Sequence, residues 1–559
     1  MYCQPDLDTP TPTYPNDASA SNNKSNKRID FLSELPLDVV IYNIVPRILS
    51  EGPTPFRLDI PNNYLDVCRT WCKRIMMVAG SMYCGIGSLF LISKQQERRL
   101  VTAAPYVKRL AIATINEKCI NQLANTVKFS SLNELTITMN GSQTVFRHFF
   151  STLANLTYLK ITYDNQVDGP FQVYDILDQC AKLVRLDLTL GEDTTMVTSN
   201  DNQHPMYYNL VHLQAICDGK SNCDMFIPLL QHLPNLHILQ LAYPPSETAM
   251  HAIHQHCPQL QQLILSQHHI RANMFIDIVQ QQQGLRLLRM DDKSFEGDYL
   301  AKLITQHHNT LESIDLHASS GTPISPFNEY RDQGAFQVKR LRSFHYEARR
   351  SPDYIPFIEW IVSHAPHLES VKLIGGLHEM HNLRTLMHRA LRRIELACEP
   401  FDQPDHWQYL QHHIQLGNGS HLKEVKCYIS VFIRDSSWMY LIPQLNRLKS
   451  LELDFQHGLK ALEPTTFMTE LSRGCDALET LTIIGGRFTS DVWIHPLLLH
   501  GNLRKLVIHG SQLSDEVLLA LEQFHHLECL HLELYKIHWN AMARLRRRIP
   551  HLQCTLLEE

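Results

Sequence analysis

The chain has 559 residues, of which 44% are hydrophobic and 19% are charged, so most of it can fold around buried apolar side chains. This length is too great for one compact core and predicts either several domains or one elongated repeat array. The formal net charge of −6 argues against a general nucleic-acid-binding protein.

Residues 1–28 are rich in Pro, Thr, Ser and Asn and have no apolar periodicity, which predicts a disordered tail. We find no basic and then apolar leader pattern there. The 14 cysteines are scattered without metal-binding spacing. They indicate reduced thiols in a protein of the cytoplasm, the nucleus or both.

From Ile29 to about residue 80 an apolar pattern predicts a small helical module. Its first helix follows the Leu35-Pro36 pair, because proline is favoured in the first turn of a helix. Farther along, Leu65, Cys68, Trp71 and Ile75 form one helical stripe.

Residues 81–106 are expected to form a connector and the start of the repeat array. The uncharged stretch Ile75–Ser93 could also be a membrane span, but its glycines and serines make it less apolar than a usual span. A buried connector is the preferred interpretation.

One motif fills residues 107–559, with apolar side chains at positions i, i+3 and i+5. Clear examples begin at Leu132, Leu156 and Leu183, and successive copies start 23 to 31 residues apart. We count eighteen copies, including weaker ones at Val107, Leu210 and Leu552. A period of about 20–29 residues built on L-x-x-L-x-L is the signature of leucine-rich repeats.

Positions i+3 and i+5 lie on the same face of a short strand, so both side chains point into a core. Helical spacing between the motifs predicts helices on the outer side, and stacked repeats complete each other's core. The predicted fold is an α/β solenoid: a leucine-rich-repeat horseshoe of about 18 repeats, preceded by the helical module.

The repeats resemble the cysteine-containing leucine-rich repeats common in F-box proteins, as in His256-Cys257-Pro258-Gln259-Leu260. The module is similar to an F-box, which begins with Leu-Pro and ends close to Val-Cys-Arg-x-Trp, here Val67-Cys68-Arg69-Thr70-Trp71. An insertion near residues 50–63 and Pro46 depart from the family pattern.

The resemblance implies a substrate-recognition subunit of a Skp–cullin–F-box ubiquitin ligase. A Skp-type adaptor would bind the F-box, and through it the cullin scaffold, while the concave repeat surface would bind a protein substrate. The residues that this places at the adaptor interface are Leu35, Pro36, Ile44, Ile48, Val67, Cys68 and Trp71. The alternative is a repeat scaffold without ligase function, in which the N-terminal helices only cap the array.

Side chains at the variable strand positions should line the concave face. Basic and acidic residues alternate there, which suits a protein partner and neither a nucleic acid nor a membrane. The candidate substrate-binding residues are Arg286, Arg289, Arg342, Lys372, Arg392 and Lys426.

No phosphate-binding loop, dinucleotide fingerprint or nucleophile elbow is present in the sequence. Some of the 32 histidines occur as neighbouring pairs such as His412-His413, which do not face the same way on a helix and so make poor chelates. We therefore expect a non-catalytic receptor that has no cofactor and no metal.

Overall fold

The computed structural model describes residues 35–40, 56–58, 69–79, 83–87, 93–139, 143–163, 172–191, 204–217, 223–243, 245–266, 276–279, 283–292, 297–318, 336–348, 355–375, 384–387, 390–398, 408–429, 437–455, 463–485, 491–511, 513, 515–534, 539–549 and 551–556. The predicted tail, residues 1–28, lies outside these ranges. All statements below concern the described residues.

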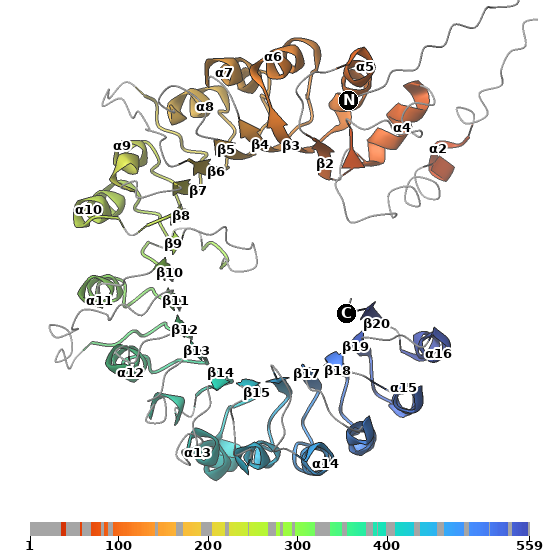
Figure 1. The fold of residues 1–559 in the computed structure, drawn as a ribbon. Coiled ribbons are helices and arrows are strands. Elements are labelled where there is room, and N and C mark those ends of the chain that lie inside the picture. Colours follow the sequence, from red (N-terminus) through yellow and green to blue (C-terminus); the bar gives the residue numbers. More distant parts are fainter. Residues whose placement is uncertain are drawn as a thin grey trace, which may run out of the picture.

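The chain forms an open arc with strands on its inner side and helices on its outer side (Figure 1). Twenty parallel strands pair in chain order into one sheet, β1 with β2 through to β19 with β20. They are β1 (Phe56–Arg57), β2 (Tyr83–Ile86), β3 (Arg109–Ile115), β4 (Glu134–Met139), β5 (Tyr158–Tyr163), β6 (Arg185–Leu190), β7 (His212–Cys217), β8 (Ile238–Leu241), β9 (Gln262–Ser266), β10 (Leu287–Asp292), β11 (Ser313–Ala318), β12 (Ser343–Ala348), β13 (Ser370–Gly375), β14 (Arg393–Cys398), β15 (Glu424–Ile429), β16 (Ser450–Phe455), β17 (Thr480–Ile484), β18 (Lys505–Ser511), β19 (Cys529–Leu534) and β20 (His551–Leu556).

The outer layer consists of α-helices and short 3-10 helices. The α-helices are α2 (Leu37–Val39), α4 (Arg69–Ala79), α5 (Lys94–Ala103), α6 (Glu117–Thr126), α7 (Gln143–Ser151), α8 (Val173–Gln179), α9 (Ile227–Leu230), α10 (Glu247–His256), α11 (Gly297–Gln306), α12 (Ile355–Ser363), α13 (Gln408–Leu416), α14 (Pro464–Gly474), α15 (Asp515–Ala520) and α16 (Trp539–Arg548). The 3-10 helices are η2 (Ala104–Tyr106), η3 (Cys223–Phe226), η6 (Arg384–Met387), η8 (Gly417–Gly419), η9 (Ser437–Gln444), η10 (Asp491–Leu499) and η11 (Leu521–Gln523).

The core lies between these two layers and consists of the repeated leucines. In β5, for example, Leu159 and Ile161 are fully buried and alternate with half-buried neighbours. Burial of each such side chain contributes about 1.5–3 kcal/mol. The predicted repeat solenoid is therefore confirmed by the strand pairing and by the burial of its motif positions.

The first leucine of a repeat sits at a turn that enters the strand. Its backbone N–H donates to the carbonyl three residues earlier, as Leu156 does to Leu153 (3.1 Å) and Leu260 to Cys257 (3.1 Å). Asparagines in front of this leucine bind the preceding repeat: the Asn235 amide donates to the Tyr208 carbonyl at 2.9 Å. These bonds, together with the strand ladder, hold successive repeats in one register.

The cysteines that precede these turns are structural. Cys180, Cys257 and Cys475 are free and buried, each at the C-terminal end of a helix. Burial raises the pKa of each thiol to about 12, so these thiols stay protonated.

The structure shifts the two ends of the predicted array. At the C-terminal end Leu552 pairs with Leu530, an i+3 position, so the last repeat begins at Ile549 and the predicted start at Leu552 was wrong by three residues. At the N-terminal end two further strands precede Val107, and β1 lies inside the segment predicted to be purely helical. The sheet therefore starts earlier than the leucine pattern indicated. The pattern missed β2 because its inward positions hold Cys84 and Ile86 in place of leucines.

No helix in the described part of the chain is long and apolar enough to span a membrane. Within the stretch Ile75–Ser93, α4 ends at Ala79 and β2 occupies Tyr83–Ile86. The structure thus divides this stretch between two short elements of the solenoid.

Candidate interaction surface on the inner face of the arc

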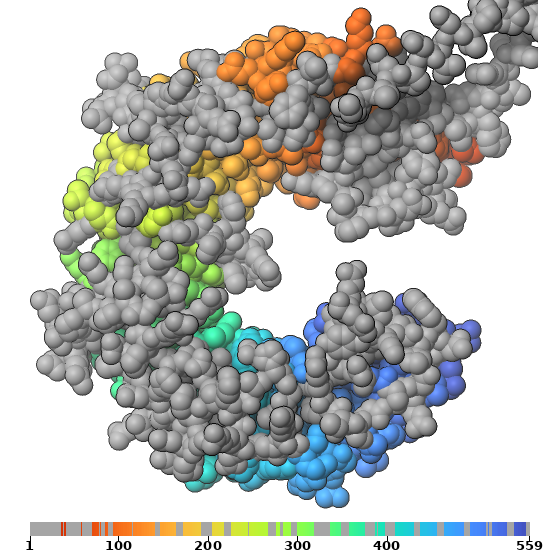
Figure 2. Space-filling model, viewed as in Figure 1, coloured from red at the N-terminus to blue at the C-terminus, as the bar shows by residue number. Residues whose placement is uncertain are grey.

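The inner face of the arc carries the strand positions i+2, i+4 and i+6, which alternate with the buried leucines. Figure 2 shows that the space enclosed by the arc is open toward the side where the two ends of the array lie. Two stretches of the inner face differ in burial and in charge.

The first stretch is the inner face of β7, β8 and β9, which we call the covered stretch. All of its inner positions are buried, although none of them belongs to the leucine motif: His212, Gln214, Ile216, Ile238, Gln240, Ala242, Gln262, Ile264 and Ser266. In a solenoid strand these side chains would normally face solvent.

Residues 276–279, the inner strap, lie against this stretch on the inner side of the arc (Figure 1). The Gln262 side-chain amide donates to the Ile276 carbonyl and accepts from the Ile276 N–H (3.3 Å). Gln261 makes the same pair of bonds with Val279, at 2.6 and 3.0 Å. Each glutamine therefore binds the strap backbone as a neighbouring strand would.

Arg286 fixes the strap from the adjacent repeat. Its guanidinium donates to the Asp277 carbonyl and forms a paired contact with Glu312, at 2.9 and 2.7 Å. Only 9% of the Arg286 side chain is exposed, so its charge serves contacts within the chain.

The second stretch is the inner face of β11–β16, which we call the open stretch. Most of its inner positions are half-buried and polar, and many carry charges of alternating sign. Lys372 lies 3.2 Å from Glu395, and Lys426 lies 2.7 Å from Glu452. Glu395 also accepts a hydrogen bond from the Tyr428 hydroxyl at 3.0 Å.

The electrostatics of the open stretch follow from this alternation. Burial alone would raise the pKa of Glu395, but Lys372 and Lys426 on either side lower it. Burial would lower the pKa of Lys426, whereas its contacts with Glu452 and Glu395 raise it. Both groups are therefore charged at neutral pH, and the stretch presents a row of ion pairs to a partner.

The six predicted substrate-binding residues do not form one patch. Arg286 and Arg289 are each only 8% exposed, and Arg289 is bound to Asp291 and Asp315 (both 3.1 Å). The charges of Arg286 and Arg289 are therefore largely neutralised within the fold.

Of the other residues, Lys372 and Lys426 do lie on the inner face, in the open stretch. Arg342 and Arg392 are exposed but occupy position i+1, at the edge of the strands, where Arg392 contacts Glu369 at 3.5 Å. Whether any of the six binds a substrate stays a prediction.

The predicted adaptor-binding residues are only partly within the described ranges. Leu35 is half-buried against the core, with its carbonyl bound by Arg74 of α4 at 2.7 Å. Pro36 and Val39 are exposed, while Val40 is buried. Ile44, Ile48, Val67 and Cys68 lie outside the described residues.

Trp71 is buried, whereas a contact with a partner requires an exposed side chain. It is 3% exposed and packs in the common core with Ile75 and Met76 of the same helix, α4. Its position supports a packing role, because a side chain so deeply buried offers little surface to an adaptor.

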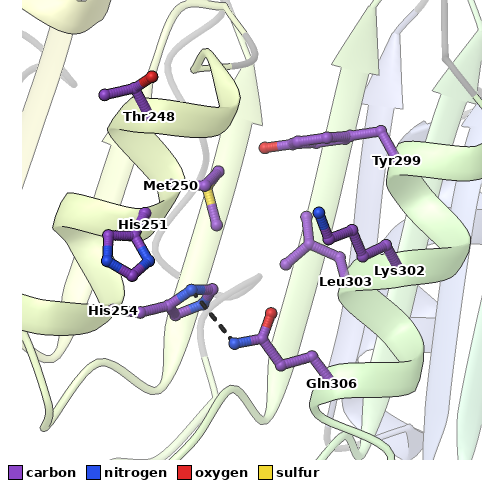
Figure 3. Close-up of a pocket in the computed structure, with 8 residues that line it drawn as sticks. All are labelled: Thr248, Met250, His251, His254, Tyr299, Lys302, Leu303 and Gln306. Carbon is purple, nitrogen blue, oxygen red and sulfur yellow. Dashed lines mark hydrogen bonds between the residues drawn. The ribbon is translucent and has the colours of Figure 1, made fainter.

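The outer face carries a pocket of about 580 Å³ between α10 and α11. Figure 3 shows Met250, His254 and Leu303 among the side chains that line it. Among the described residues between β9 and β10 there is no helix, and residues 276–279 lie on the inner face. The pocket therefore occupies the position between α10 and α11 where an outer helix of this repeat would lie.

Sequence reasoning missed three features of these surfaces: the inner strap, the outer pocket, and a His–Asp cluster at Asp315, His317 and His345. Leucine periodicity carries no signal for the strap. The cluster could have been found by aligning the repeats, because the three residues occupy positions i+4, i+6 and i+4 of neighbouring strands.

Comparison with known proteins adds little. No protein-family model and no curated protein matches the chain. One similar solved structure is that of the Toll–Spatzle complex from Drosophila, at 15% identity and a TM-score of 0.34, covering 80% of this chain and 53% of that one. The chain thus spans about half the length of that protein.

A second similar structure is the Rad7 and Elc1 complex in yeast, at 16% identity and a TM-score of 0.38. It covers 60% of this chain and 79% of the other. The solenoid architecture rests on the strand pairing of the chain itself, and neither similarity bears on what the chain binds.

Proposed function

We propose that this chain is a non-catalytic receptor that holds a protein substrate on the open stretch of its inner face. The observation that carries the proposal is the contrast on that face. The covered stretch is closed by the chain itself, whereas the open stretch keeps its ion pairs accessible inside an arc that Figure 2 shows to be open. Alternating charges at partly exposed positions favour recognition of a protein of mixed charge.

We further propose that residues 29–80 dock on a Skp-type adaptor, which would make the chain the substrate-recognition subunit of a cullin ubiquitin ligase. The support is the resemblance of Leu35-Pro36 and Val67–Trp71 to the F-box, together with the exposure of Pro36 and Val39 beside α4. The chain's role in ubiquitin transfer would then be to hold a substrate near the transfer enzyme.

A second candidate function is that of a repeat scaffold without an adaptor, whose N-terminal segment only caps the array. Two observations favour it: β1 extends the sheet through its pairing with β2, and Trp71 is buried in the core. Both are what a cap requires, because the end of a solenoid must be covered.

The two candidates are separated by mixing the purified full chain with a purified Skp-type adaptor and measuring binding by calorimetry. The double variant Pro36→Ala/Val39→Glu changes exposed side chains and leaves the half-buried Leu35 in place. If the adaptor docks there, wild type binds and the variant binds at least ~10-fold more weakly, because the new carboxylate enters an apolar contact.

The matched control is Leu499→Glu, which adds the same charge at a side chain that is 87% exposed on η10. It should bind the adaptor like wild type. A folded wild-type chain that does not bind, or a double variant that binds equally well, would exclude docking through this segment.

A further inference from the structure

The open stretch begins with a cluster of metal-binding side chains on neighbouring strands. Asp315 and His317 lie on β11 and His345 on β12, and one donor atom from each lies within 4.8 Å of the other two. Asp315 Oδ1 is 2.8 Å from His317 Nε2 and 2.5 Å from His345 Nδ1. One carboxylate oxygen is therefore in contact with an imidazole nitrogen from each side.

These contacts have the length of hydrogen bonds, which would require a proton on each facing imidazole nitrogen. When the facing nitrogens carry no proton, Asp315 Oδ1 and His317 Nε2 are buried atoms without a hydrogen-bond partner among the described residues. Leaving such atoms without a partner costs about 1–3 kcal/mol each. Acceptor atoms this close together require either a proton on each imidazole nitrogen or a cation among them.

Two of the three ligands, Asp315 and His317, are held by partners on their far sides. Arg289 Nη1 binds the other oxygen of Asp315 (Oδ2) at 3.1 Å, which leaves Oδ1 directed at the histidines. Glu347 Oε2 lies 3.2 Å from His317 Nδ1, and a hydrogen placed on Nδ1 leaves Nε2 as the lone-pair donor. Such carboxylate–histidine pairs orient the ligands in protein metal centres.

The charge of the surroundings fits a divalent cation. With neutral imidazoles, the carboxylates of Asp291, Asp315 and Glu347 against the guanidinium of Arg289 leave a net charge of −2. Lys372, beside His345 on β13, is itself paired with Glu395 at 3.2 Å. Asp291 Oδ1 lies 3.9 Å from His317 Nε2 and is the nearest further oxygen donor. Two imidazoles with one or two carboxylates form a donor set typical of zinc.

We propose that Asp315, His317 and His345 bind one Zn²⁺ ion on the inner face of the arc. The three side chains are 15–22% exposed, so a coordination position remains open toward the space that a partner would occupy. The site stands independently of ligase function: it concerns the repeats alone.

A second group, His509, His531 and Glu533, has similar composition but lacks this support. His509 Nδ1 lies 3.4 Å from Glu533 Oε2, and Nε2 of His509 is the one buried atom of the group without a hydrogen-bond partner among the described residues. It provides a matched control within the same chain.

Two protons on the imidazoles would balance the same negative charge. Burial alone would lower the pKa of His317, but Asp315 and Glu347 raise it to about 9, so protons compete with a metal at neutral pH. A direct metal titration distinguishes a zinc centre from a doubly protonated ion-pair cluster.

The experiment is a calorimetric titration of the full chain, without a histidine tag and stripped by chelator, with Zn²⁺. We expect one sub-micromolar site per chain. Asp315→Asn and His345→Ala should each weaken it at least ~100-fold, and Glu347→Gln, which alters only the support of His317, about 10–100-fold. Cobalt added in place of zinc should give the visible absorption of a low-symmetry site in wild type and not in Asp315→Asn or His345→Ala.

The controls are His531→Ala in the second group and the exposed His367→Ala, both of which should keep the tight site. Asp315→Asn is nearly isosteric, and circular dichroism verifies that each variant is folded. If wild type binds zinc no more tightly than His345→Ala, or if His531→Ala removes the tight site instead, the proposal is overturned.

Discussion

The covered and open stretches of the inner face are built on the same interior. Leu239 of β8 and Leu451 of β16 occupy equivalent inward positions, and both are fully buried. Their outward neighbours differ: Gln240 is buried in the covered stretch, whereas Glu452 is half-buried and bound to Lys426. The leucine pattern therefore determines where the core lies. Whether the inner face is accessible to a partner depends on whether another segment of the chain packs against it.

The first test of this comparison truncates one buried leucine in each stretch. Leu239→Ala and Leu451→Ala should each lower the free energy of unfolding by about 2–5 kcal/mol, because each leaves a cavity in a closely packed layer. The two losses should be similar. Urea unfolding measures them, with the exposed Leu499→Ala as a control expected to lose less than ~0.5 kcal/mol. A loss confined to one stretch would show that the two interiors are not equivalent.

The second test compares the loss of the buried basic residue that binds the strap with the loss of a more exposed basic residue in the open stretch. Arg286→Met removes a buried guanidinium from Glu312 and from the strap, and should cost about 2–3 kcal/mol. Lys372→Met removes a more exposed charge and should cost about 1 kcal/mol or less, because Glu395 keeps its contacts with Lys426 and Tyr428.

Unfolding in urea gives both values, and limited proteolysis follows the strap. Cleavage within residues 276–279 should become faster in Arg286→Met and stay unchanged in Lys372→Met. Equal cleavage in all three proteins would show that Arg286 does not hold the strap in place.

The third test uses pH on the covered stretch. Burial, and secondarily the nearby Arg185, lower the pKa of His212 to about 4, against the opposing effect of Asp187. The unfolded chain, with the ordinary value of 6.5, therefore binds this proton more readily than the native chain between pH 6.5 and 4. Stability should be lost as the pH falls through this window, by about 2 kcal/mol for this group.

His212→Gln should remove that part of the acid sensitivity, seen as a smaller difference in unfolding free energy between pH 7 and pH 4.5. The exposed His367→Ala serves as the control and should keep the wild-type slope. An unchanged slope in His212→Gln would mean that His212 is not held neutral by its surroundings.

The sequence was sufficient to predict the solenoid, because each buried leucine repeats at a fixed spacing and periodicity reports burial directly. The same signal failed at both ends of the array. At the N-terminal end Cys84 and Ile86 take inward positions without leucine. At the C-terminal end positions i and i+3 are both apolar, so Leu552 was assigned to i although it occupies i+3. It could not predict the fate of Arg286 and Arg289, since their neutralisation depends on the strap, Glu312, Asp291 and Asp315. The predicted adaptor and substrate contacts stay predictions, because they depend on partners that the chain alone does not specify.

The most direct test of partner binding on the open stretch is site-specific photo-crosslinking in cells. A photoreactive residue replaces, in turn, the half-exposed Glu452 of the open stretch, the exposed Val279 of the strap, or the exposed Leu499 of the outer layer. The account predicts a covalent protein adduct from position 452 and none from positions 279 or 499. Adducts from position 499 alone, or the same adducts from all three positions, would contradict it.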